Sequence, residues 1–294
     1  YLGFPNTYGT LGYILSAKIK LVEAKPYVHI ENISFTDPKK YIEEITKYNN
    51  ANPNNIDFLD GMILNKNELY LMKGKMIEEK PSYLNKYVRQ VYYKTINKQQ
   101  YDYMTIKDYI WRYDSNSFYL DGFLQNKFLR YYLGDLLSVY KLKKIKEIKL
   151  FNILSQNNNT ESITNDLAIK LENFTNFLDW YDEHINVYPV WICPYKCKKD
   201  YTFFKCDSKL ELDFGIGFGI QKVNEHNDNN YYKKLIDDKM YNMKSIKGLY
   251  SDTFLPEDKF WELYDPSNKY DLLKKKYDPN DRFLNLYEKA VKNK

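Results

Sequence analysis

The sequence predicts an α+β fold in which helices flank an antiparallel sheet. The first observation is composition: 44% of the 294 residues are hydrophobic, and 31 Tyr and 16 Phe supply enough apolar surface for a packed core, which excludes a disordered chain. The second is order, because strand-like and helix-like segments follow one another without regular strand–helix–strand alternation. The third is the length of the apolar runs, since even Tyr188–Cys193 falls far short of the roughly 18 residues that a membrane span needs.

Residues 1–24 begin with turn-forming residues and end in an alternating segment. Gly3, Pro5 and Gly9 lie in the opening turns. The alternation of apolar and lysine side chains from Ala17 to Leu21 predicts a strand.

Residues 26–75 predict the order strand, helix, strand, strand. Pro38 follows a Thr–Asp pair, which is a common start for a helix. Two further alternating segments are separated by Asn65–Asn67, which predicts a hairpin. The predicted elements are a strand at Tyr27–Phe35, a helix from Pro38 through Tyr48, and strands at Asp57–Leu64 and Glu68–Lys75.

Residues 165–276 predict a related mixture of strands and helices. Because each half of the chain buries only one face of its strands, we expect residues 26–75 and 165–255 to contribute to one mainly antiparallel sheet. The predicted elements are a helix at Asn165–His184, strands at Val187–Cys193 and Leu210–Ile220, a helix at Tyr231–Met243, a strand at Gly248–Thr253, and helices at Pro256–Tyr264 and Tyr270–Lys276.

Between these halves, residues 80–155 predict a mostly helical insertion that is rich in aromatic and basic side chains. Leu142, Ile145, Ile148 and Phe151 are spaced three residues apart and are surrounded by lysines, which predicts an amphipathic basic helix. Such a helix either packs its apolar stripe on the protein and leaves its lysines in solvent, or contacts a membrane surface.

The charge pattern argues against nucleic-acid binding. The net charge is +5, and only 4 of the 44 basic residues are Arg, the side chain that phosphate and base recognition favours. The positive charge therefore indicates a solvated surface.

The three cysteines predict neither a metal site nor a disulfide. Cys193, Cys197 and Cys206 have the spacing C-x3-C-x8-C, which lacks the fourth ligand of a zinc site, and the nearest histidine is His184. An odd number of cysteines also favours a reducing compartment, and thus an intracellular protein.

One short motif points to a ligand. Gly9-Thr10-Leu11-Gly12 places two glycines around a hydroxyl residue, which either forms an ordinary turn before a strand or lets the backbone approach a flat or anionic ligand. Together with Pro5 and the strand predicted at Ala17–Leu21, this motif resembles the end of the FAD-binding domain in vanillyl-alcohol-oxidase-type flavoproteins.

Within that superfamily the chain resembles the 24-dehydrocholesterol reductase family (seladin and the plant dwarf-type sterol reductases). The most specific match is Val187–Pro194, V-Y-P-V-W-I-C-P, which is close to the family's V-Y-P-I-W-L-C-P. Asp57–Ile63 resembles an acidic strand of the family, with Asp60 in place of Glu. Weaker matches extend the resemblance from Pro5 to Ala290 and comprise Asn165–Leu167, Leu212–Gly215, Phe260–Glu262 and Lys275–Asn285.

The resemblance implies a domain division. Residues 1–24 would be the last strands of an FAD-binding domain, and residues 25–294 a substrate or cap domain with an antiparallel sheet, flanking helices and the insertion at about 80–155. In the family, most of the FAD-binding domain precedes the segment that corresponds to Gly9–Gly12. We therefore expect an upstream segment or a partner chain to supply it.

The resemblance also implies an activity. The family reaction is an FAD-dependent hydride transfer between the flavin and a carbon–carbon double bond, with NADPH as the reductant and a hydrophobic sterol-like or lipid-like substrate. It implies a place in the cytoplasm or at an internal membrane such as the endoplasmic reticulum. Two alternatives are another oxidase of the superfamily that acts on a lipid-like substrate, and an inactive relative that uses the cap fold to bind proteins.

The segment that matches the family's catalytic stretch is altered. The family has Y-H-R-H-T-R, and here Arg112 is kept while Trp111 and Tyr113 replace the histidines. The candidate catalytic residues are Arg112, Tyr113 and Tyr109, and a tyrosine acts as an acid near neutral pH only if its pKa is strongly perturbed. Arg112 would stabilise an anionic reduced flavin, or else pairs with a neighbouring aspartate, Asp108 or Asp114.

The candidate cofactor-binding residues come from three segments. Trp191 would form a wall of the flavin or substrate pocket, or else belongs to the core, and Asp213 is interpreted as a buried, hydrogen-bonded structural carboxylate. We expect Gly9 and Gly12 at the mouth of the largest apolar cleft, with Arg112 and Trp191 converging on it. The full set is Gly9, Thr10, Leu11, Gly12, Trp191 and Arg282, the last from a C-terminal motif that closes over the flavin in these flavoproteins.

Overall fold

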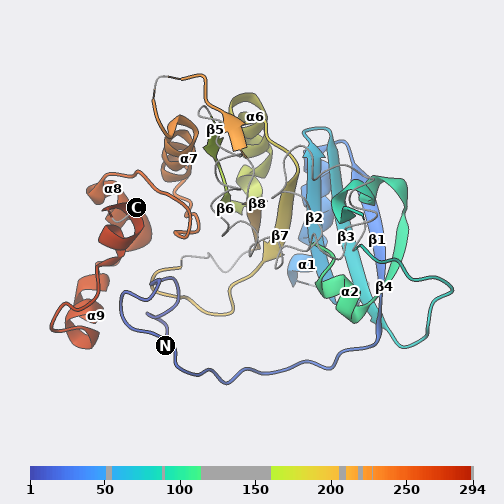
Figure 1. The fold of residues 1–294 in the computed structure, drawn as a ribbon, viewed down its shortest axis with the longest axis horizontal. Coiled ribbons are helices and arrows are strands. Elements are labelled where there is room, and N and C mark those ends of the chain that lie inside the picture. The colour runs from blue at the N-terminus through green and yellow to red at the C-terminus, as the bar shows by residue number, and fades with distance from the viewer. Residues whose placement is uncertain are drawn as a thin grey trace, which may run out of the picture.

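A seven-stranded antiparallel sheet forms the centre of the molecule. The computed structural model describes residues 1–50, 55–87, 90–113, 160–204, 210–217, 221–226 and 228–292. The strand order is β4-β1-β3-β2-β7-β8-β6, and every neighbouring pair is antiparallel. This arrangement confirms the predicted α+β class, with helices on the flanks of the sheet (Figure 1).

The N-terminal half of the sheet follows the prediction closely. The β2–β3 hairpin pairs Asn65 with Glu68, so Lys66 and Asn67 form its turn. The elements are β1 (Tyr27–Phe35), α1 (Pro38–Asn50), β2 (Phe58–Asn65), β3 (Glu68–Ile77) and β4 (Tyr101–Thr105).

The C-terminal half adds three strands to the same sheet. The junction lies between β2 and β7, where Gly61 pairs with Ile192 and Met62 with Trp191. This pairing confirms that residues 26–75 and 165–255 share one sheet. The added strands are β6 (Asn165–Lys170), β7 (Val190–Tyr195) and β8 (Glu211–Ile216), while β5 (Thr160–Ser162) and β9 (Gln221–Val223) form a separate ribbon.

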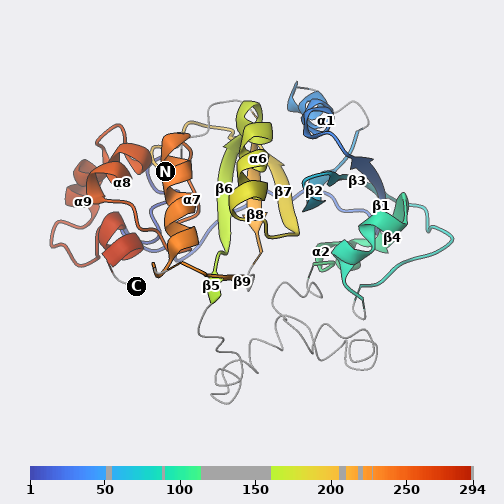
Figure 2. The ribbon, with the colours of Figure 1, turned by 90° about the horizontal axis from the view of Figure 1, so that it is seen from above.

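Helices cover one face of the sheet. The helix α6 (Phe174–His184) lies over β6, β8 and β7, and α1 lies on the same side over β2 and β3 (Figure 2). The main core fills this layer; its largest fully buried side chains are Tyr41, Phe174, Phe177, Tyr181 and Phe214. Further elements are α7 (Tyr231–Asn242), α8 (Glu257–Tyr264), α9 (Tyr270–Tyr277) and the short α2 (Ile106–Ile110).

Two smaller cores complete the packing. One lies on the other face of β1, β3 and β2, where Tyr92 and Tyr109 cover Met72 and Val28. The other joins the C-terminal helices to the N-terminal turns, and Leu11 belongs to it together with Leu286.

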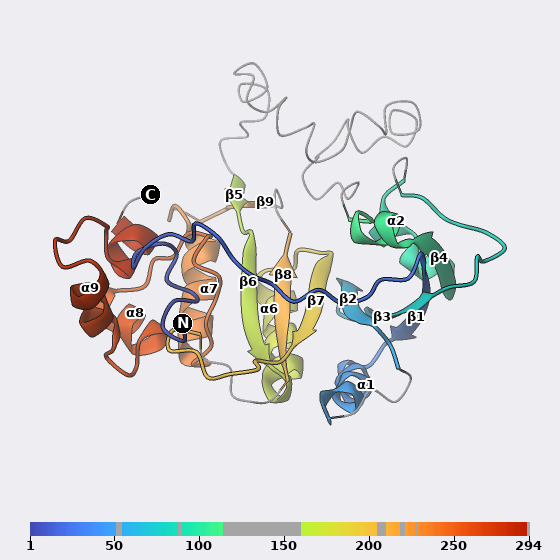
Figure 3. The same ribbon diagram turned by 90° about the horizontal axis from the view of Figure 1, so that it is seen from below.

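We call residues 1–12 the N-terminal arm and residues 13–26 the crossing segment. The arm is fixed to distant parts of the chain: Asn6 Nδ2 donates to the carbonyl of Phe203 at 2.7 Å, and Tyr270 OH donates to Thr10 Oγ1 at 2.7 Å. The crossing segment then runs below the sheet to β1 (Figure 1), and seen from below it passes in front of β6, β8, β7 and β2 (Figure 3).

The strand predicted at Ala17–Leu21 is not formed. The crossing segment contains no strand, and Leu15, Ile19 and Leu21 are 98%, 74% and 78% exposed. Its alternating pattern has no neighbouring strand, among the described residues, with which to pair. The domain division at residue 24 stays a prediction.

Two other predictions were wrong, both near β6. The predicted helix Asn165–His184 starts as a strand, and only Phe174–His184 is α-helical. In β6 every second side chain is buried, namely Asn165, Leu167 and Ile169, which is the period of a strand. The sequence did not reveal this period because Leu167 also fits the helical stripe that continues into α6. The predicted strand Gly248–Thr253 is a loop, whose amide of Gly248 donates to the carbonyl of Asp166 at 2.8 Å without forming a strand of the sheet.

The insertion is less helical than predicted as far as it is described. Residues 80–113 contain β4, α2 and two short 3₁₀ turns. The predicted basic amphipathic helix at 142–151 lies outside the described residues. No helix in the described ranges is both long and apolar enough to cross a bilayer.

Candidate functional site

The face of β6, β8 and β7 opposite α6 carries polar and aromatic side chains. The alternation of these strands buries Leu167, Phe214 and Ile192 under the helices and turns the intervening residues to the other face. The strand register sets two rows across this open face: one contains Cys193, Asp213 and Ala168, and the next contains Trp191, Gly215 and Asp166.

A cavity of about 380 Å³ lies on this open face. We call it the sheet-face cavity. Asp166, Cys193 and Asp213 contribute from the strands, Tyr250 contributes from the loop after α7, and Tyr8 from the N-terminal arm. The cavity is thus built from three parts of the chain that are far apart in sequence.

Gly215 keeps the middle of the second row open. A Cβ placed on this residue would lie 3.3 Å from the Trp191 ring and 3.5 Å from Asp166 Oδ1. A larger residue would therefore press on both neighbours, and glycine leaves a gap between the indole and the carboxylate.

The two carboxylates of the cavity differ in their surroundings. Burial, followed by the negative charge of Asp166, raises the pKa of Asp213 to about 7. Burial also raises the pKa of Asp166, but there the hydroxyl of Tyr250 donates a hydrogen bond that opposes the shift. The interpretation of Asp213 as a hydrogen-bonded structural carboxylate was wrong, because no described residue donates a hydrogen bond to it.

Cys193 keeps its proton in this site. Burial, together with the charges of Asp60 and Asp213, raises the pKa of its thiol to about 12. Cys197 forms no disulfide with a described residue, and Cys206 lies outside the described residues. Within the described ranges, no three His, Cys, Asp or Glu side chains lie close enough to hold a metal ion.

Next to this cavity, Asp60 on β2 collects three donors on one oxygen. Oδ2 lies 2.7 Å from Arg112 Nη2, 2.5 Å from the Tyr113 hydroxyl and 3.1 Å from Trp191 Nε1. The carboxylate and the guanidinium are 5% and 7% exposed, so this is a buried ion pair. Among the described residues Arg112 therefore pairs with Asp60 and not with Asp108, and Asp114 lies outside them.

Aromatic rings enclose this ion pair. The guanidinium carbon of Arg112 lies 3.9 Å from the ring centroid of Tyr109, 4.3 Å from that of Tyr113 and 5.5 Å from that of Tyr92. Burial and the charge of Asp60 raise the pKa values of Tyr109 and Tyr113. Both tyrosines therefore hold their protons more firmly than usual, which is the opposite of what an acid catalyst needs.

The glycine motif lines a second cavity, of about 980 Å³. Gly9 and Gly12 have φ values of +79° and +139°, which only glycine adopts readily. A Cβ on Gly12 would meet no atom within 4 Å, so the backbone there faces open space. Thr10 is 1% exposed and does not line this cavity, whereas Leu11, 8% exposed, packs in the C-terminal core and also contributes to the cavity wall.

The predicted site residues therefore fall into two groups. Arg112 and Trp191 converge on each other, but they meet at Asp60 and do not line the glycine cavity. Arg282 is exposed and lines neither cavity, while Leu273 and Tyr277 from the same C-terminal region do line the glycine cavity. Asn6 and Tyr8 line both cavities and so connect them.

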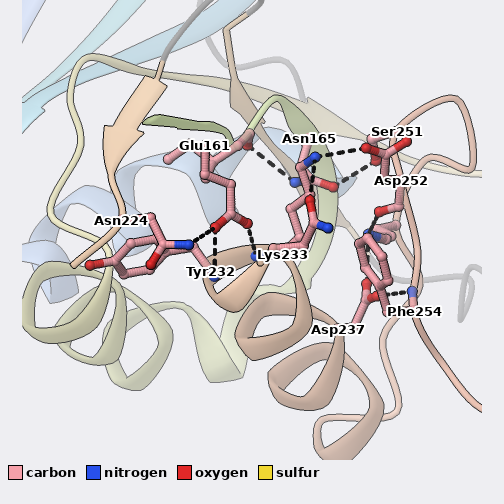
Figure 4. A network of polar contacts seen from close by, with 12 residues as sticks. Glu161, Asn165, Asn224, Tyr232, Lys233, Asp237, Ser251, Asp252 and Phe254 are labelled. Atoms are coloured by element: carbon pink, nitrogen blue, oxygen red, sulfur yellow. Dashed lines mark hydrogen bonds and ion pairs between the residues drawn. The ribbon is translucent and has the colours of Figure 1, made fainter. Parts of the chain in front are cut away.

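The loop that contributes Tyr250 and Lys247 to the sheet-face cavity could not be predicted from the sequence. Ser251 donates to Asn165 Oδ1 at 2.7 Å, and Asp237 accepts from the amide of Phe254 at 2.6 Å (Figure 4). Lys247, which lines the cavity, is paired with the same Asp237 at 2.6 Å. These contacts hold Tyr250 against β6, a placement that depends on contacts between distant segments.

The same figure shows how β5 holds the first turn of α7. Glu161 accepts from the amides of Tyr232 and Lys233 at 3.2 and 2.8 Å (Figure 4). A carboxylate at a helix N-terminus satisfies free amides and complements the helix dipole. The β5–β9 ribbon is therefore fixed to the helix that precedes the cavity loop.

The glycine cavity fits one edge of a flavin. Gly9 and Gly12 allow a flat ring to approach the backbone, and Gly12 provides the space that a Cβ would fill. The segments that bind the pyrophosphate in the resembled family have no counterpart in this chain. These residues therefore suit the ring part of the cofactor.

No protein-family model matches the chain. Curated relatives are the delta(24)-sterol reductases of Mus musculus, 24% identical over 311 aligned residues, and of Arabidopsis thaliana, 22% identical over 337. These alignments cover 99% and 100% of this chain but 58% and 59% of the relatives, so the chain spans little more than half their length.

Solved structures with a partly similar backbone include a BBE-like protein of Arabidopsis thaliana and a glucooligosaccharide oxidase of Acremonium strictum. Their TM-scores are 0.46 and 0.44, at 11% and 16% identity, and the alignments cover 91% and 90% of this chain and 57% and 55% of those chains. The sequence comparison is the informative one: the chain resembles the delta(24)-sterol reductases over nearly its whole length, which confirms the resemblance that its motifs indicate.

Proposed function

We propose that the chain is the substrate-binding part of an FAD-dependent oxidoreductase that reduces a carbon–carbon double bond of a sterol-like or lipid-like molecule. The observation that carries the proposal is the sheet-face cavity. Its floor comes from the segments by which the chain resembles the sterol reductases, since Cys193 and Asp213 both belong to those segments.

The flavin supplies hydride chemistry when it is bound, and the chain positions the substrate. Gly9 and Gly12 would hold the ring edge in the glycine cavity, and the alkene would bind in the sheet-face cavity, which shares Asn6 and Tyr8 with it. NADPH is the proposed reductant. An upstream segment or partner chain holds the rest of the cofactor, in the cytoplasm or at an internal membrane such as the endoplasmic reticulum.

We assign a positioning role to Arg112, Tyr113 and Tyr109. Because Asp60 compensates the charge of Arg112, the guanidinium stabilises an anionic flavin less than a free cation would. Its main effect is to hold Asp60, which in turn fixes Trp191 beside the gap at Gly215.

Anaerobic flavin spectroscopy on the full polypeptide tests this function. The purified protein is expected to show bound-flavin absorbance, which NADPH bleaches and a sterol with a side-chain double bond restores. The matched control is the same sterol with that bond saturated, which should leave the flavin reduced. A full polypeptide without flavin would contradict the proposal and favour the alternative of a protein-binding cap.

A further inference from the structure

Reduction of an alkene by hydride transfer needs a proton as well as a hydride, and few groups in this chain can supply it. All three histidines, His29, His184 and His226, lie in described ranges, and none of them lines either cavity. Among the described residues of the two cavities, a proton donor would therefore be another kind of side chain.

The titratable groups that line the cavity with Asp213 come from three parts of the chain. They are Asp166 on β6, Cys193 and Tyr195 on β7, Lys247 and Tyr250 on the loop after α7, and Tyr8 on the N-terminal arm. The hydroxyl of Tyr195 donates to Glu211 at 2.8 Å and is occupied by that bond. Lys247 is occupied by its ion pair with Asp237 at 2.6 Å.

The phenols and the thiol are poor acids in this place. Burial raises the pKa values of Tyr8, Tyr250 and Cys193, so each holds its proton well above neutral pH. Only the two carboxyls remain within reach of the working pH.

The two carboxyls divide the roles between them. The hydroxyl of Tyr250 hydrogen-bonds Asp166 and favours its charged form, whereas Asp213 receives no hydrogen bond from a described residue. A charged Asp166 holds the proton on its neighbour, as in other carboxyl pairs whose environments separate their titrations.

We propose that Asp213 is the acid that delivers the proton to the substrate carbon, with Asp166 as the ionised partner that keeps it protonated. The inference rests on the proposed function. It assigns to a strand carboxyl the proton transfer for which Tyr109 and Tyr113 are poorly suited.

The step balances as follows. Hydride from the reduced flavin forms one C–H bond at the alkene, and the alkene π electron pair takes the proton from the Asp213 carboxyl to form the other. The flavin is oxidised, the substrate gains two electrons, and the Asp213 carboxylate takes its next proton from solvent. A reduced nicotinamide then reduces the flavin again.

The test separates the two half-reactions in Asp213→Asn, Asp213→Glu and the control Asp179→Asn, which removes an exposed carboxylate of α6. In the flavin-loaded full polypeptide, Asp213→Asn should leave flavin reduction by NADPH unchanged. It should slow reoxidation by the alkene by roughly 10²–10⁴-fold, the usual contribution of a general acid. Asp213→Glu should recover part of that loss, and Asp179→Asn should match the unmodified protein.

The pH profile provides a second readout. The reoxidation rate should fall about tenfold per pH unit above roughly pH 7 in the unmodified protein and stay flat in Asp213→Asn. Normal reoxidation by Asp213→Asn in a protein that does reduce the alkene would overturn the acid and leave the proposed function standing. A full polypeptide that binds no flavin would contradict both the proposed acid and the proposed function.

A third readout needs no activity. Carboxyl carbon NMR of the chain without flavin should show one aspartate that titrates near pH 7 and is missing in Asp213→Asn. If that variant does not fold, Asp213→Glu and the unmodified chain still decide the matter, because an Asp213 carboxyl that titrates near pH 4 would refute the proposal.

Discussion

At the scale of single residues, the surroundings of each side chain on the open face of the sheet determine its protonation. Asp213 and Asp166 lie on neighbouring strands, diagonal to each other in the register, yet only one of them receives a hydrogen bond from Tyr250. The hydrogen bond favours the charged form of Asp166, and Asp213 has no such bond to favour its charged form. This difference affects the stability of the protein as well as the proposed catalysis.

The first prediction concerns the pH dependence of stability. Asp213 keeps its proton to about pH 7 in the folded protein but loses it near pH 3.8 when unfolded, so this group destabilises the fold as the pH rises between these values. Asp213→Asn removes the effect, and above pH 7 the variant should be more stable by on the order of 2 kcal/mol, since solvent reaches part of the carboxyl. Urea unfolding at a series of pH values measures it.

The control for this series is Asp179→Asn, an exposed carboxylate paired with Lys66. It should follow the unmodified protein at every pH. If the stability curves of Asp213→Asn and the unmodified protein run parallel from pH 4 to 8, Asp213 has an ordinary pKa.

The second prediction concerns the buried ion pair. Arg112→Ala leaves the Asp60 carboxylate buried without its cation and should cost about 3–5 kcal/mol of unfolding free energy. Adding Asp60→Asn should recover part of this loss, because the uncompensated charge is gone. Chemical denaturation of the single and double variants measures the coupling.

Lys66→Ala is the matched control, since its pair with Asp179 is largely exposed and should contribute less than about 1 kcal/mol. If Arg112→Ala and Lys66→Ala lower the unfolding free energy by equal amounts, the pair of Arg112 with Asp60 does not behave as a buried ion pair. Trp191 fluorescence reports the same event, because its indole N–H donates to Asp60.

At the scale of elements, α1 lies close against β2 at Gly61. A Cβ on Gly61 would lie 1.9 Å from the hydroxyl of Tyr41 and 3.0 Å from the carbonyl oxygen of Tyr70. The absence of a side chain at Gly61 therefore lets the helix lie flat on the strand. The Tyr41 hydroxyl is buried there and has no hydrogen-bond partner among the described residues.

The third prediction follows from this contact. Gly61→Ala should destabilise the protein by about 1–3 kcal/mol through overpacking. Combining it with Tyr41→Phe should restore part of the stability, because the substitution deletes the atom in conflict, and Tyr41→Phe alone should be nearly neutral. Thermal unfolding of the three variants tests this, and no rescue in the double variant would show that the strand backbone, not the hydroxyl, sets the limit.

The elements also show what the sequence can predict. The β1–α1–β2–β3 unit was predicted nearly to the residue, because its periods are clear and its turns carry Asn and Pro. β6 was predicted as the start of a helix, because Leu167, Leu171 and Phe174 have helical spacing. The same spacing is compatible with a strand that is followed by a helix, which is what the structure has. Local periodicity contains no information about the neighbouring strand that decides between them.

The same limit applies to the site. Arg112, Trp191, Asp213 and Asp60 were all found in the sequence through family motifs, but Asp60 was given no role in the site. Their meeting on one face depends on the β2–β7 register, which joins segments about 130 residues apart. Tyr8 and Tyr250 carry no motif, so their place in the cavity was not foreseeable.

For the molecule as a whole, the crossing segment is a long exposed stretch of the described chain. Lys18 and Lys20 are exposed, in a stretch without helix or strand, while the arm before it is fixed by hydrogen bonds from Asn6 and Tyr270. A protease should therefore cut this segment before it cuts at a lysine within the described strands of the sheet.

The fourth prediction is a stable nicked form. Limited trypsin digestion should cut first after Lys18 or Lys20, and the released N-terminal piece should stay bound, because residues 1–12 are packed on the C-terminal helices. Mass spectrometry under native and denaturing conditions distinguishes a retained from a released piece. As an internal control, the buried Lys73 and Lys274 should resist cleavage until the protein unfolds.

The packing of the N-terminal arm also determines when, during synthesis on the ribosome, this part of the fold can form. Thr10 contacts Tyr270, 260 positions later, so the arm leaves the exit tunnel long before its partners exist. The half of the sheet built from β1 to β4 is local in sequence and can assemble meanwhile. The earliest-made residues of this sequence are therefore among the last to be secured, and until then the glycine cavity has only one of its walls.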